Sequence, residues 1–424
     1  MSVKVRSNLP AQSAARRRVL FVSPVGTDPV TAGHARRVSD LCDSVAALGY
    51  EVWFLFLPTY DFPAADLRAM RRRWGGRVLA GDYRWPVWPV ALRHAAHCRA
   101  PKEFQRPLLK ALDFLGASQS AAQDAYAQSV DRQFEERWAH QVRALHRRLR
   151  FHAVFVEYVF FSRVLAALPS NVLKIVDTID VFAERSDRFA RAGVAEGWRQ
   201  TTGADEVAAL RRADVVVAIQ ADEAEEFRTR GLNRVVTIGH LGGPPAAYDR
   251  VASPGPTVAL VASASTVNDR GLEWFATEVF PRVLGRVPGA VFQVAGNICR
   301  SADLRGRANI EPLGVVPNLA TVYAGADVVV NPVPTGTGLA IKSVEALSYG
   351  VPLVATPSGA RGLSDARGRG LAVCASAEAF ADAVASLLLS PGLRRQQAEA
   401  ATQFSADYRK KQADALARLL SVGD

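Results

Sequence analysis

A lysine and a glutamate in the last third of the chain are the side chains best placed to bind an anionic ligand. Lys342 and Glu345 lie three residues apart, in a stretch whose apolar periodicity predicts a helix beginning near Leu339. A lysine brings a full positive charge to a diphosphate, and an ionised carboxylate can accept hydrogen bonds from two neighbouring hydroxyls, as a ribose offers. The pair therefore predicts binding of a nucleoside diphosphate.

The turn before this helix favours the ligand site over the alternative, a solvated ion pair on an exposed helix. Gly336, Thr337 and Gly338 form the turn. Backbone N–H groups at a helix start attract anions, and glycines let a phosphate come close to them. At 100° per residue Gly338 falls on the same side of the helix as Lys342 and Glu345, opposite an apolar stripe. We expect this polar side to face something other than the core.

The elements that position these residues form one strand, turn, helix and strand unit. Val328 to Val330 is a short β-branched run, typical of a buried strand. Gly350 is placed to end the helix, and Val351 to Ala355 predicts the next strand. Such a unit belongs to a parallel α/β sheet.

The segment GTGLAIKSVEALSYGVPLVAT, residues 336–356, resembles the donor-nucleotide motif of GT-B glycosyltransferases, specifically the retaining glycosyltransferase family 4. The resemblance implies that Lys342 holds the donor diphosphate and Glu345 the ribose, with the turn through Leu339 against the donor. The family pattern has a further glutamate, near the transferred sugar, where this sequence has Thr337. Sugar recognition is therefore the point at which the sequence departs from the family.

The turn STVNDRG follows the predicted strand Val258 to Ala262 and offers further contacts to the same nucleotide. We expect Asn268, Asp269 and Arg270 to lie in this loop, with a helix starting at Leu272. Asn268 is assigned to donor binding and Arg270 to the phosphates. The alternative for Arg270 is a loop arginine that faces solvent.

The first half of the chain opens with the strand Arg17 to Ser23, a loop, a helix and the strand Glu51 to Leu57. The helix carries a stripe of Val38, Leu41, Val45 and Leu48. This βαβ order implies a parallel sheet, and its loop lacks the G-x-G-x-x-G of a dinucleotide site. Gly33, just before the helix, resembles the glycine that lies against donor and acceptor in GT-B enzymes; a structural turn glycine is the alternative.

Two carboxylates follow the predicted strand Val172 to Val176, namely Asp177 and Asp180. Open α/β sheets bind ligands at the carboxyl ends of their strands, and the resemblance places acceptor or sugar contacts here. We assign Asp180 to orienting the acceptor hydroxyl. Asp177 is either a second site residue or a helix cap.

The domain organisation follows from where the strand and helix pattern breaks. Gly and Pro dominate 241–256, which is the predicted linker. We expect a flexible tail at 1–15, an acceptor-side Rossmann-like domain at 16–240, a donor-binding domain at 257–400, and a helix at 401–424 that crosses back to the first domain. The expected fold is α/β of the GT-B type, with two doubly wound parallel sheets facing across a cleft.

Composition narrows the environment and the partners. The chain has 424 residues, a net charge of +11, four dispersed cysteines and no apolar run near the ~18 residues of a membrane helix. These features indicate a cytoplasmic protein, and the Arg and Ala content indicates a bacterium with GC-rich DNA. Basic and aromatic residues interleave through a predicted helical insertion at 60–150, which suits peripheral membrane contact or a bulky anionic acceptor. Nucleic acid is not expected, since no recognised motif accompanies the charge.

The sequence thus predicts a metal-independent, retaining glycosyltransferase that moves a sugar from a nucleoside-diphosphate sugar to a hydroxyl acceptor, with no cofactor. The acceptor would be a lipid-linked or cell-surface polysaccharide precursor at the inner membrane face. No Asp-x-Asp occurs, and His94, His97 and Cys98 have no second cluster to complete a metal site. Two alternatives remain: a GT-B epimerase acting on a UDP-sugar, and a non-catalytic nucleotide-binding subunit.

Overall fold

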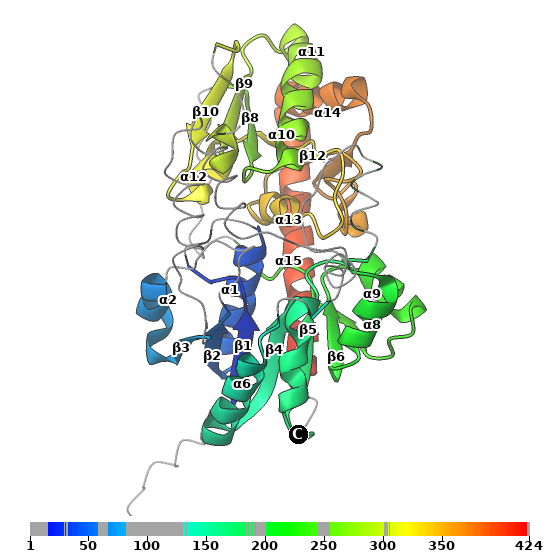
Figure 1. Ribbon diagram of the computed structural model, residues 1–424. Helices are drawn as coiled ribbons and strands as arrows, with labels where there is room; N and C mark the ends of the chain where they lie inside the picture. Colours follow the sequence, from blue (N-terminus) through cyan, green and yellow to red (C-terminus); the bar gives the residue numbers. More distant parts are fainter. Residues whose placement is uncertain are drawn as a thin grey trace, which may run out of the picture.

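The computed structural model describes residues 16–28, 30, 33–57, 67–81, 130–131, 134–183, 185, 189, 191, 201–243, 255–300, 304 and 306–421. These residues form two parallel sheets, one above the other in Figure 1, and helices α1 and α13 lie at their junction. The predicted tail, most of the predicted linker, most of the 60–150 insertion and the His94, His97 and Cys98 group lie outside the described residues.

The first sheet has seven strands in the order β3-β2-β1-β4-β5-β6-β7, all paired in parallel. Its strands are β1 Arg18–Ser23, β2 Glu51–Phe56, β3 Val78–Ala80, β4 Phe151–Glu157, β5 Leu173–Asp177, β6 Val215–Ala218 and β7 Val235–Thr237. The accompanying helices are α1 Gly33–Ala47, α2 Leu67–Trp74, α6 Glu136–Leu149, α8 Gly203–Leu210 and α9 Ala221–Thr229, with short 3₁₀ segments at Gly75–Arg77 and Val159–Ala167.

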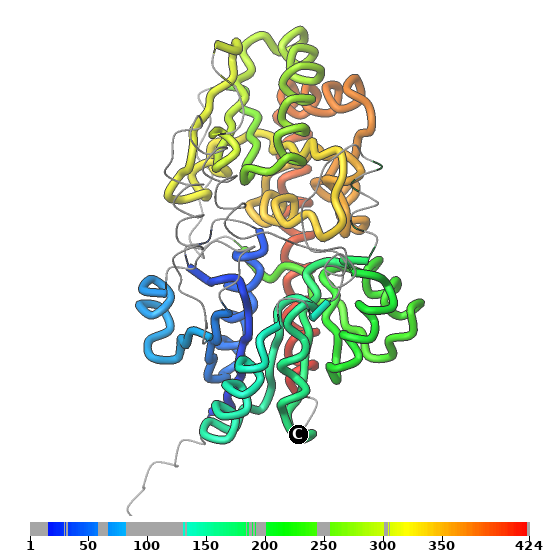
Figure 2. Tube along the Cα trace, viewed as in Figure 1, coloured from blue at the N-terminus to red at the C-terminus, as the bar shows by residue number. Residues whose placement is uncertain are grey.

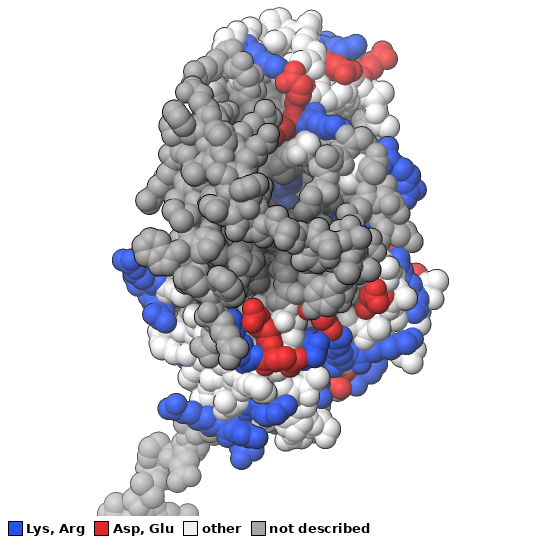
Figure 3. All heavy atoms as spheres, in the orientation of Figure 1, with Lys and Arg blue, Asp and Glu red and all other residues white. Residues whose placement is uncertain are grey.

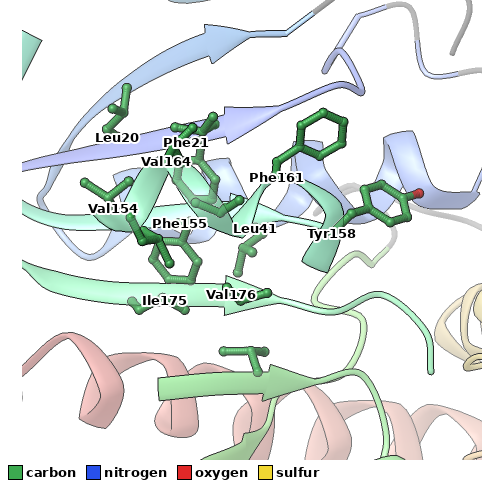
Figure 4. Packing of buried hydrophobic residues seen from close by; sticks show 14 of the residues in the cluster. Leu20, Phe21, Leu41, Val154, Phe155, Tyr158, Phe161, Val164, Ile175 and Val176 are labelled. Atoms are coloured by element: carbon green, nitrogen blue, oxygen red, sulfur yellow. The ribbon is translucent and has the colours of Figure 1, made fainter. Parts of the chain in front are cut away.

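The middle of this sheet is buried on both faces, which explains its nearly continuous apolar runs. Phe21 of β1 stacks on Phe155 of β4 with ring centroids 4.9 Å apart, and Leu41 of α1 packs in the same cluster (Figure 4). The expected α1 stripe is confirmed except at its last position. Leu48 is 41% exposed because the helix ends at Ala47, one residue before it.

The second sheet has six parallel strands in the order β10-β9-β8-β11-β12-β13. Its strands are β8 Thr257–Val261, β9 Val291–Ala295, β10 Ile310–Gly314, β11 Val328–Asn331, β12 Leu353–Ala355 and β13 Leu371–Val373. Its helices are α10 Thr266–Trp274, the π-helical turn Phe275–Val279, α11 Phe280–Arg286, α12 Leu319–Gly325, α13 Ile341–Ser348 and α14 Ala377–Leu389, with 3₁₀ turns at Asn297–Arg300 and Ser364–Ala366. Two parallel-sheet α/β domains of this kind confirm the predicted fold class.

The long helix α15, Pro391–Ser421, runs through both halves of the molecule (Figure 2). Its residues Ala401 and Phe404 belong to the core around α13 and β12. Leu416, Leu419 and Leu420 belong to the core of the first sheet. None of the helices within the described part of the chain combines the length and the apolarity that a bilayer span needs.

Two predicted boundaries, at the start of α13 and the start of β12, are each wrong by two residues. Helix α13 begins at Ile341 rather than near Leu339, and β12 begins at Leu353 rather than Val351. Val351 N donates to Ala346 O at 3.2 Å after Gly350 with φ 64°, so this residue closes the helix instead of starting the strand.

The segment 268–270, expected in a loop, lies inside helix α10. Ser265 Oγ accepts a hydrogen bond from Asn268 N at 3.2 Å and so caps the helix before Thr266. Ser265, three residues after the predicted strand ends at Ala262, is the signal for a helix that starts well before Leu272.

Candidate functional site

The start of α13 is held in place by a buried asparagine at the end of β11. Asn331 Nδ2 donates to Ser343 Oγ at 2.8 Å and to Gly359 O at 3.1 Å, and Ser343 Oγ donates to Gly359 O at 2.6 Å. A Cβ on Gly359 would lie 2.3 Å from Asn331 O, so only glycine fits this close approach. These contacts tie the strand, the helix and the 356–359 turn into one rigid unit.

Helix α10 packs against the chain that leaves β11 and so brings Asn268 to Lys342. A Cβ on Gly271 would lie 2.9 Å from Pro332 O, which shows how closely the two segments approach. Lys342 Nζ donates to Asn268 Oδ1, and Asn268 Nδ2 donates to Ser263 O at 2.8 Å. Asn268 therefore orients the lysine without neutralising it.

Lys342 forms no ion pair with a carboxylate of the described residues. Burial lowers the pKa of Lys342 to about 8, and the charge of Glu345 opposes this shift. An anion bound beside the ammonium group would favour its charged form and raise that pKa again. The lysine is thus a partly buried cation with no ion-pair partner among the described residues.

Glu345 is paired across the domain junction with Arg36 of α1. Arg36 Nε donates to Glu345 Oε1 at 3.3 Å, and the glutamate side chain is 15% exposed. Burial raises the pKa of Glu345, whereas Arg36 and Lys342 oppose the shift. Gly33, the first residue of α1, faces the start of α13, because a Cβ there would lie 3.5 Å from Ile341 Cδ1. The N-terminal ends of α1 and α13 therefore meet.

The turn before α13 is held by two loops of the first domain. Thr337 Oγ1 donates to Asp180 Oδ2 at 2.6 Å, and Thr337 O accepts from Gln220 Nε2 at 3.1 Å. Asp180 lies beyond the carboxyl end of β5 and Gln220 beyond that of β6. A Cβ on Gly338 would lie 3.3 Å from Ile179 O, so the glycine allows the loop to come this near. Thr337 thus occupies the family's glutamate position as an interdomain contact.

Asp180 is already engaged on both carboxylate oxygens. Oδ1 accepts from Val181 N at 2.9 Å, and Oδ2 accepts from Arg185 Nη1 as well as from Thr337. Arg185 Nη1 also lies 3.3 Å from Thr337 Oγ1. Ile179, next to Asp180, has φ 63°, a strained conformation for a β-branched residue. The loop is therefore fixed by its contacts rather than by its own preference.

The remaining predicted site residues lie apart from this cluster of contacts. Arg270 is exposed on α10, two residues beyond Asn268, and Leu339 is buried at 7% exposure. Space is open around Gly336, where an added Cβ would meet no atom within 4 Å. Asp177 is neither a helix cap nor open to a ligand, because Arg37 binds both of its oxygens, at 2.7 and 2.8 Å.

Sequence reasoning missed four residues that the structure brings to the junction: Arg36, Arg37, Arg185 and Gln220. Arg37 could have been found, because it precedes Leu41 by four residues and so puts a charge on the apolar stripe of α1. A charge on a core-facing stripe predicts a buried ion pair. Arg36, Arg185 and Gln220 carry no comparable signal, since their partners in the second domain are distant in the sequence.

Metal-ligating side chains do not cluster in the described residues, where no three His, Cys, Asp or Glu could hold one ion. Figure 3 shows lysine and arginine side chains spread over the periphery of one face of the molecule instead of gathered in a single patch. On the described part of this face, the lysine and arginine side chains do not form one dominant cationic surface.

Comparison with known proteins gives a family match and many structural ones. Residues 255–390 match the sequence model of the family described as glycosyl transferases group 1, over the domain that carries Lys342 and Glu345. Sucrose-phosphate synthase from Thermosynechococcus elongatus is similar with a TM-score of 0.61 and 16% identity, over 95% of this chain and 97% of that one. A comparison with the curated proteins found no match.

Two further solved structures were obtained with nucleotide and sugar. Anabaena HepE, in complex with UDP and glucose, has a TM-score of 0.59 and 12% identity, over 96% of this chain and 100% of that one. The pneumococcal O-GlcNAc transferase GtfA, in complex with UDP and GlcNAc, has a TM-score of 0.61 and 11% identity, over 96% of this chain and 99% of that one. The chain thus has the fold of the GT-B glycosyltransferases, and its second domain resembles theirs in sequence.

Proposed function

We propose that this protein is a retaining glycosyltransferase that transfers a sugar from a nucleoside-diphosphate sugar to a hydroxyl acceptor. One observation carries the proposal: Lys342 and Glu345 lie together on α13 at the domain junction, and the lysine is held by Asn268 without a carboxylate partner in the part of the chain that the structure describes. The family match over 255–390 supports sugar transfer as the general activity.

The chemistry follows from where negative charge develops. When the bond to the sugar breaks, charge accumulates on the leaving diphosphate. Lys342 and the N–H groups at the start of α13 would stabilise that charge, with Arg270 as a further cation on α10. The carboxylate of Glu345 would hold the ribose hydroxyls. Because lysine, arginine and backbone dipoles supply the positive charge, the proposal needs no divalent ion.

The acceptor side of the proposal centres on Asp180. An acceptor hydroxyl could reach Oδ2 of Asp180 only by replacing the Thr337 hydroxyl that now donates to it at 2.6 Å. We propose a cytoplasmic enzyme whose acceptor is a lipid-linked or polysaccharide precursor, brought by peripheral contact with the inner membrane face.

A donor and acceptor assay separates this function from its alternatives. Thermal-shift screening against UDP, GDP and ADP identifies the base, since a ligand stabilises the fold in proportion to its saturation. UDP-glucose and UDP-GlcNAc are the first donors to test, because the HepE and GtfA structures hold UDP with those sugars. The assay then follows diphosphate release and sugar products with and without membrane extract as acceptor source.

If the protein transfers a sugar, the nucleoside diphosphate should be released and a new glycoside should form only when an acceptor is present. Conversion of the donor with no acceptor would instead identify an epimerase. Binding without any turnover, across donors and extracts, would identify a non-catalytic subunit, and failure to bind any of the diphosphates would refute the proposal altogether.

A further inference from the structure

Arg36 stands between two carboxylates that belong to different domains. Its Nε donates to Glu345 Oε1 of α13 at 3.3 Å, and its Nη1 lies 4.0 Å from Asp40 Oδ1, one turn further along α1. The arginine side chain is 37% exposed and that of Glu345 is 15% exposed. This pair is therefore open to solvent on the arginine side and joins α1 to the helix that carries the nucleotide-binding residues.

The charge of Arg36 favours the ionised form of Glu345. Burial raises the pKa of this carboxyl, and the charge of Arg36 is the main effect that opposes the rise. An ionised carboxylate accepts hydrogen bonds on both oxygens, whereas a protonated one loses much of that capacity. Without Arg36, Glu345 would be a poorer acceptor for a pair of neighbouring hydroxyls.

The pairing leaves room for a ligand on the same carboxylate. Arg36 engages only Oε1 of Glu345, and Oε2 has no hydrogen-bond partner among the described residues. Ser348, one turn along, donates to the backbone oxygen of Glu345 and not to its side chain. The arginine thus fixes one oxygen and leaves the other available.

We propose that Arg36 is a positioning residue for ribose recognition, supplied by the first domain to a carboxylate of the second. This inference rests on the proposed function. Arg36 does not touch the nucleotide; it keeps Glu345 charged and turned so that Oε2 accepts a hydrogen bond from a ribose hydroxyl. Nucleotide recognition by α13 therefore requires the contact between the two domains.

The test measures preference for ribose over deoxyribose. The diphosphate selected by the thermal-shift screen of UDP, GDP and ADP, and its 2′-deoxy counterpart, are titrated by calorimetry into the full chain. A hydrogen bond to a charged acceptor corresponds to a preference of about tenfold or more in the unmodified protein. E345Q and R36Q should each reduce that ratio to about twofold, while R36K, which retains the charge, should keep most of it.

A double variant and a surface control complete the design. R36Q/E345Q should show the same ratio as E345Q alone, because the arginine acts only through the glutamate. R148A, an exposed arginine at the end of α6, should match the unmodified protein. Thermal unfolding of each variant reports whether it is folded. If R36Q is unfolded, R36M, which also removes the charge, takes its place and should reduce the ratio to about twofold.

A purely structural role for Arg36 would weaken both nucleotides equally and leave the ratio intact, and that result would overturn the inference while sparing the proposed function. An unchanged ratio in R36Q with a lost ratio in E345Q would have the same meaning. If the unmodified protein binds none of the three diphosphates, the proposed function itself fails and this inference falls with it.

Discussion

Two neighbouring arginines on α1 bind carboxylates in opposite ways. Arg37 holds both oxygens of Asp177, at 2.7 and 2.8 Å, and donates to Ile238 O and Gly239 O at 2.8 Å each. Its side chain is 2% exposed and that of Asp177 is 0% exposed. Arg36 makes one longer contact to Glu345, at 3.3 Å, and remains 37% exposed. One helix turn therefore carries a fixed pair and an accessible one.

This difference distinguishes the buried Arg37 pair, which stabilises the fold, from the accessible Arg36 pair, which has the exposure that ligand binding requires. Arg37 binds the end of β5 to the chain that leaves β7. Burial and the charge of Asp177 raise the pKa of Glu157, which is fully buried at the end of β4. The Arg37–Asp177 pair is closed to solvent, so a substrate cannot reach it. The Arg36 pair keeps one carboxylate oxygen available, as an exchangeable site must.

Removing Arg37 should cause the largest loss of stability and is therefore the strongest test of the difference between the two pairs. R37M would leave Asp177 buried without its cation and two carbonyls without a donor, which costs about 3–5 kcal/mol of unfolding free energy. R36M, at the accessible pair, should cost about 0–1 kcal/mol. Urea denaturation of both variants checks the contrast. Similar losses in the two would show that the pairs do not differ as their burial suggests.

Removing Lys342 tests the proposed ligand site on α13, the helix that carries the accessible Glu345. K342A should slow turnover by about 10² to 10³ because it removes one electrostatic contact to the leaving diphosphate. Steady-state kinetics with the donor identified by screening gives the measurement. K410A on α15, where the lysine side chain is 79% exposed, is the matched control and should leave turnover unchanged. Near-normal turnover in K342A would contradict the assignment of this lysine.

The pH dependence of stability tests the environment of Asp40, the second carboxylate near Arg36 on α1. Burial raises the pKa of Asp40 from 3.8 to about 7, so the folded chain binds its proton more tightly than the unfolded chain does. The stability from this group is complete below pH 4 and is lost as pH rises to about 7. The groups facing Asp40 are Arg36, Asp43, Arg73, Glu345 and His240.

The variant D40N lacks this titration, so its unfolding free energy relative to the unmodified protein should rise by about 3–4 kcal/mol between pH 4 and pH 7.5. Denaturation curves at several pH values give the difference, in which the contributions of the other groups cancel. A difference that does not change with pH would mean that folding does not raise the pKa of Asp40.

Substitution of Thr337 should give the smallest loss of stability. It tests how much the hydroxyl contact to Asp180 contributes to the junction between the domains. T337V removes the hydroxyl that donates to Asp180 and keeps the shape, which should cost about 1 kcal/mol. T229V, an exposed position on α9, should change stability by no more than about 0.5 kcal/mol. A gain in turnover in T337V would show that the hydroxyl competes with the acceptor at Asp180.

The strand, turn and helix unit around Lys342 could be predicted because its signals are local. The β-branched run of β11, the glycines of the turn and Gly350 at the helix end all lie within a short segment. The partners of that unit could not be predicted, because the contacts from Thr337 to Asp180 and from Glu345 to Arg36 join residues 157 and 309 positions apart. A single sequence carries no signal for such pairings unless a charge interrupts an apolar stripe, as Arg37 does.

Asp180 also shows that a single sequence can predict where a residue lies but not which distant residues it contacts. Its position after β5 correctly indicated the edge of the sheet where the domains meet. The sequence could not show that Arg185 and Thr337 already occupy its oxygens, since that depends on how the two domains pack. Prediction therefore placed Asp180 at the correct edge of the sheet but did not show which contacts its side chain makes.

Helix α15 also governs the order in which the molecule can be built. Leu416, Leu419 and Leu420 fill part of the core whose strands begin at residue 18, so the ribosome makes those strands long before their leucines exist. The apolar face of the first domain that these leucines cover therefore stays unfilled until the second domain has been synthesised.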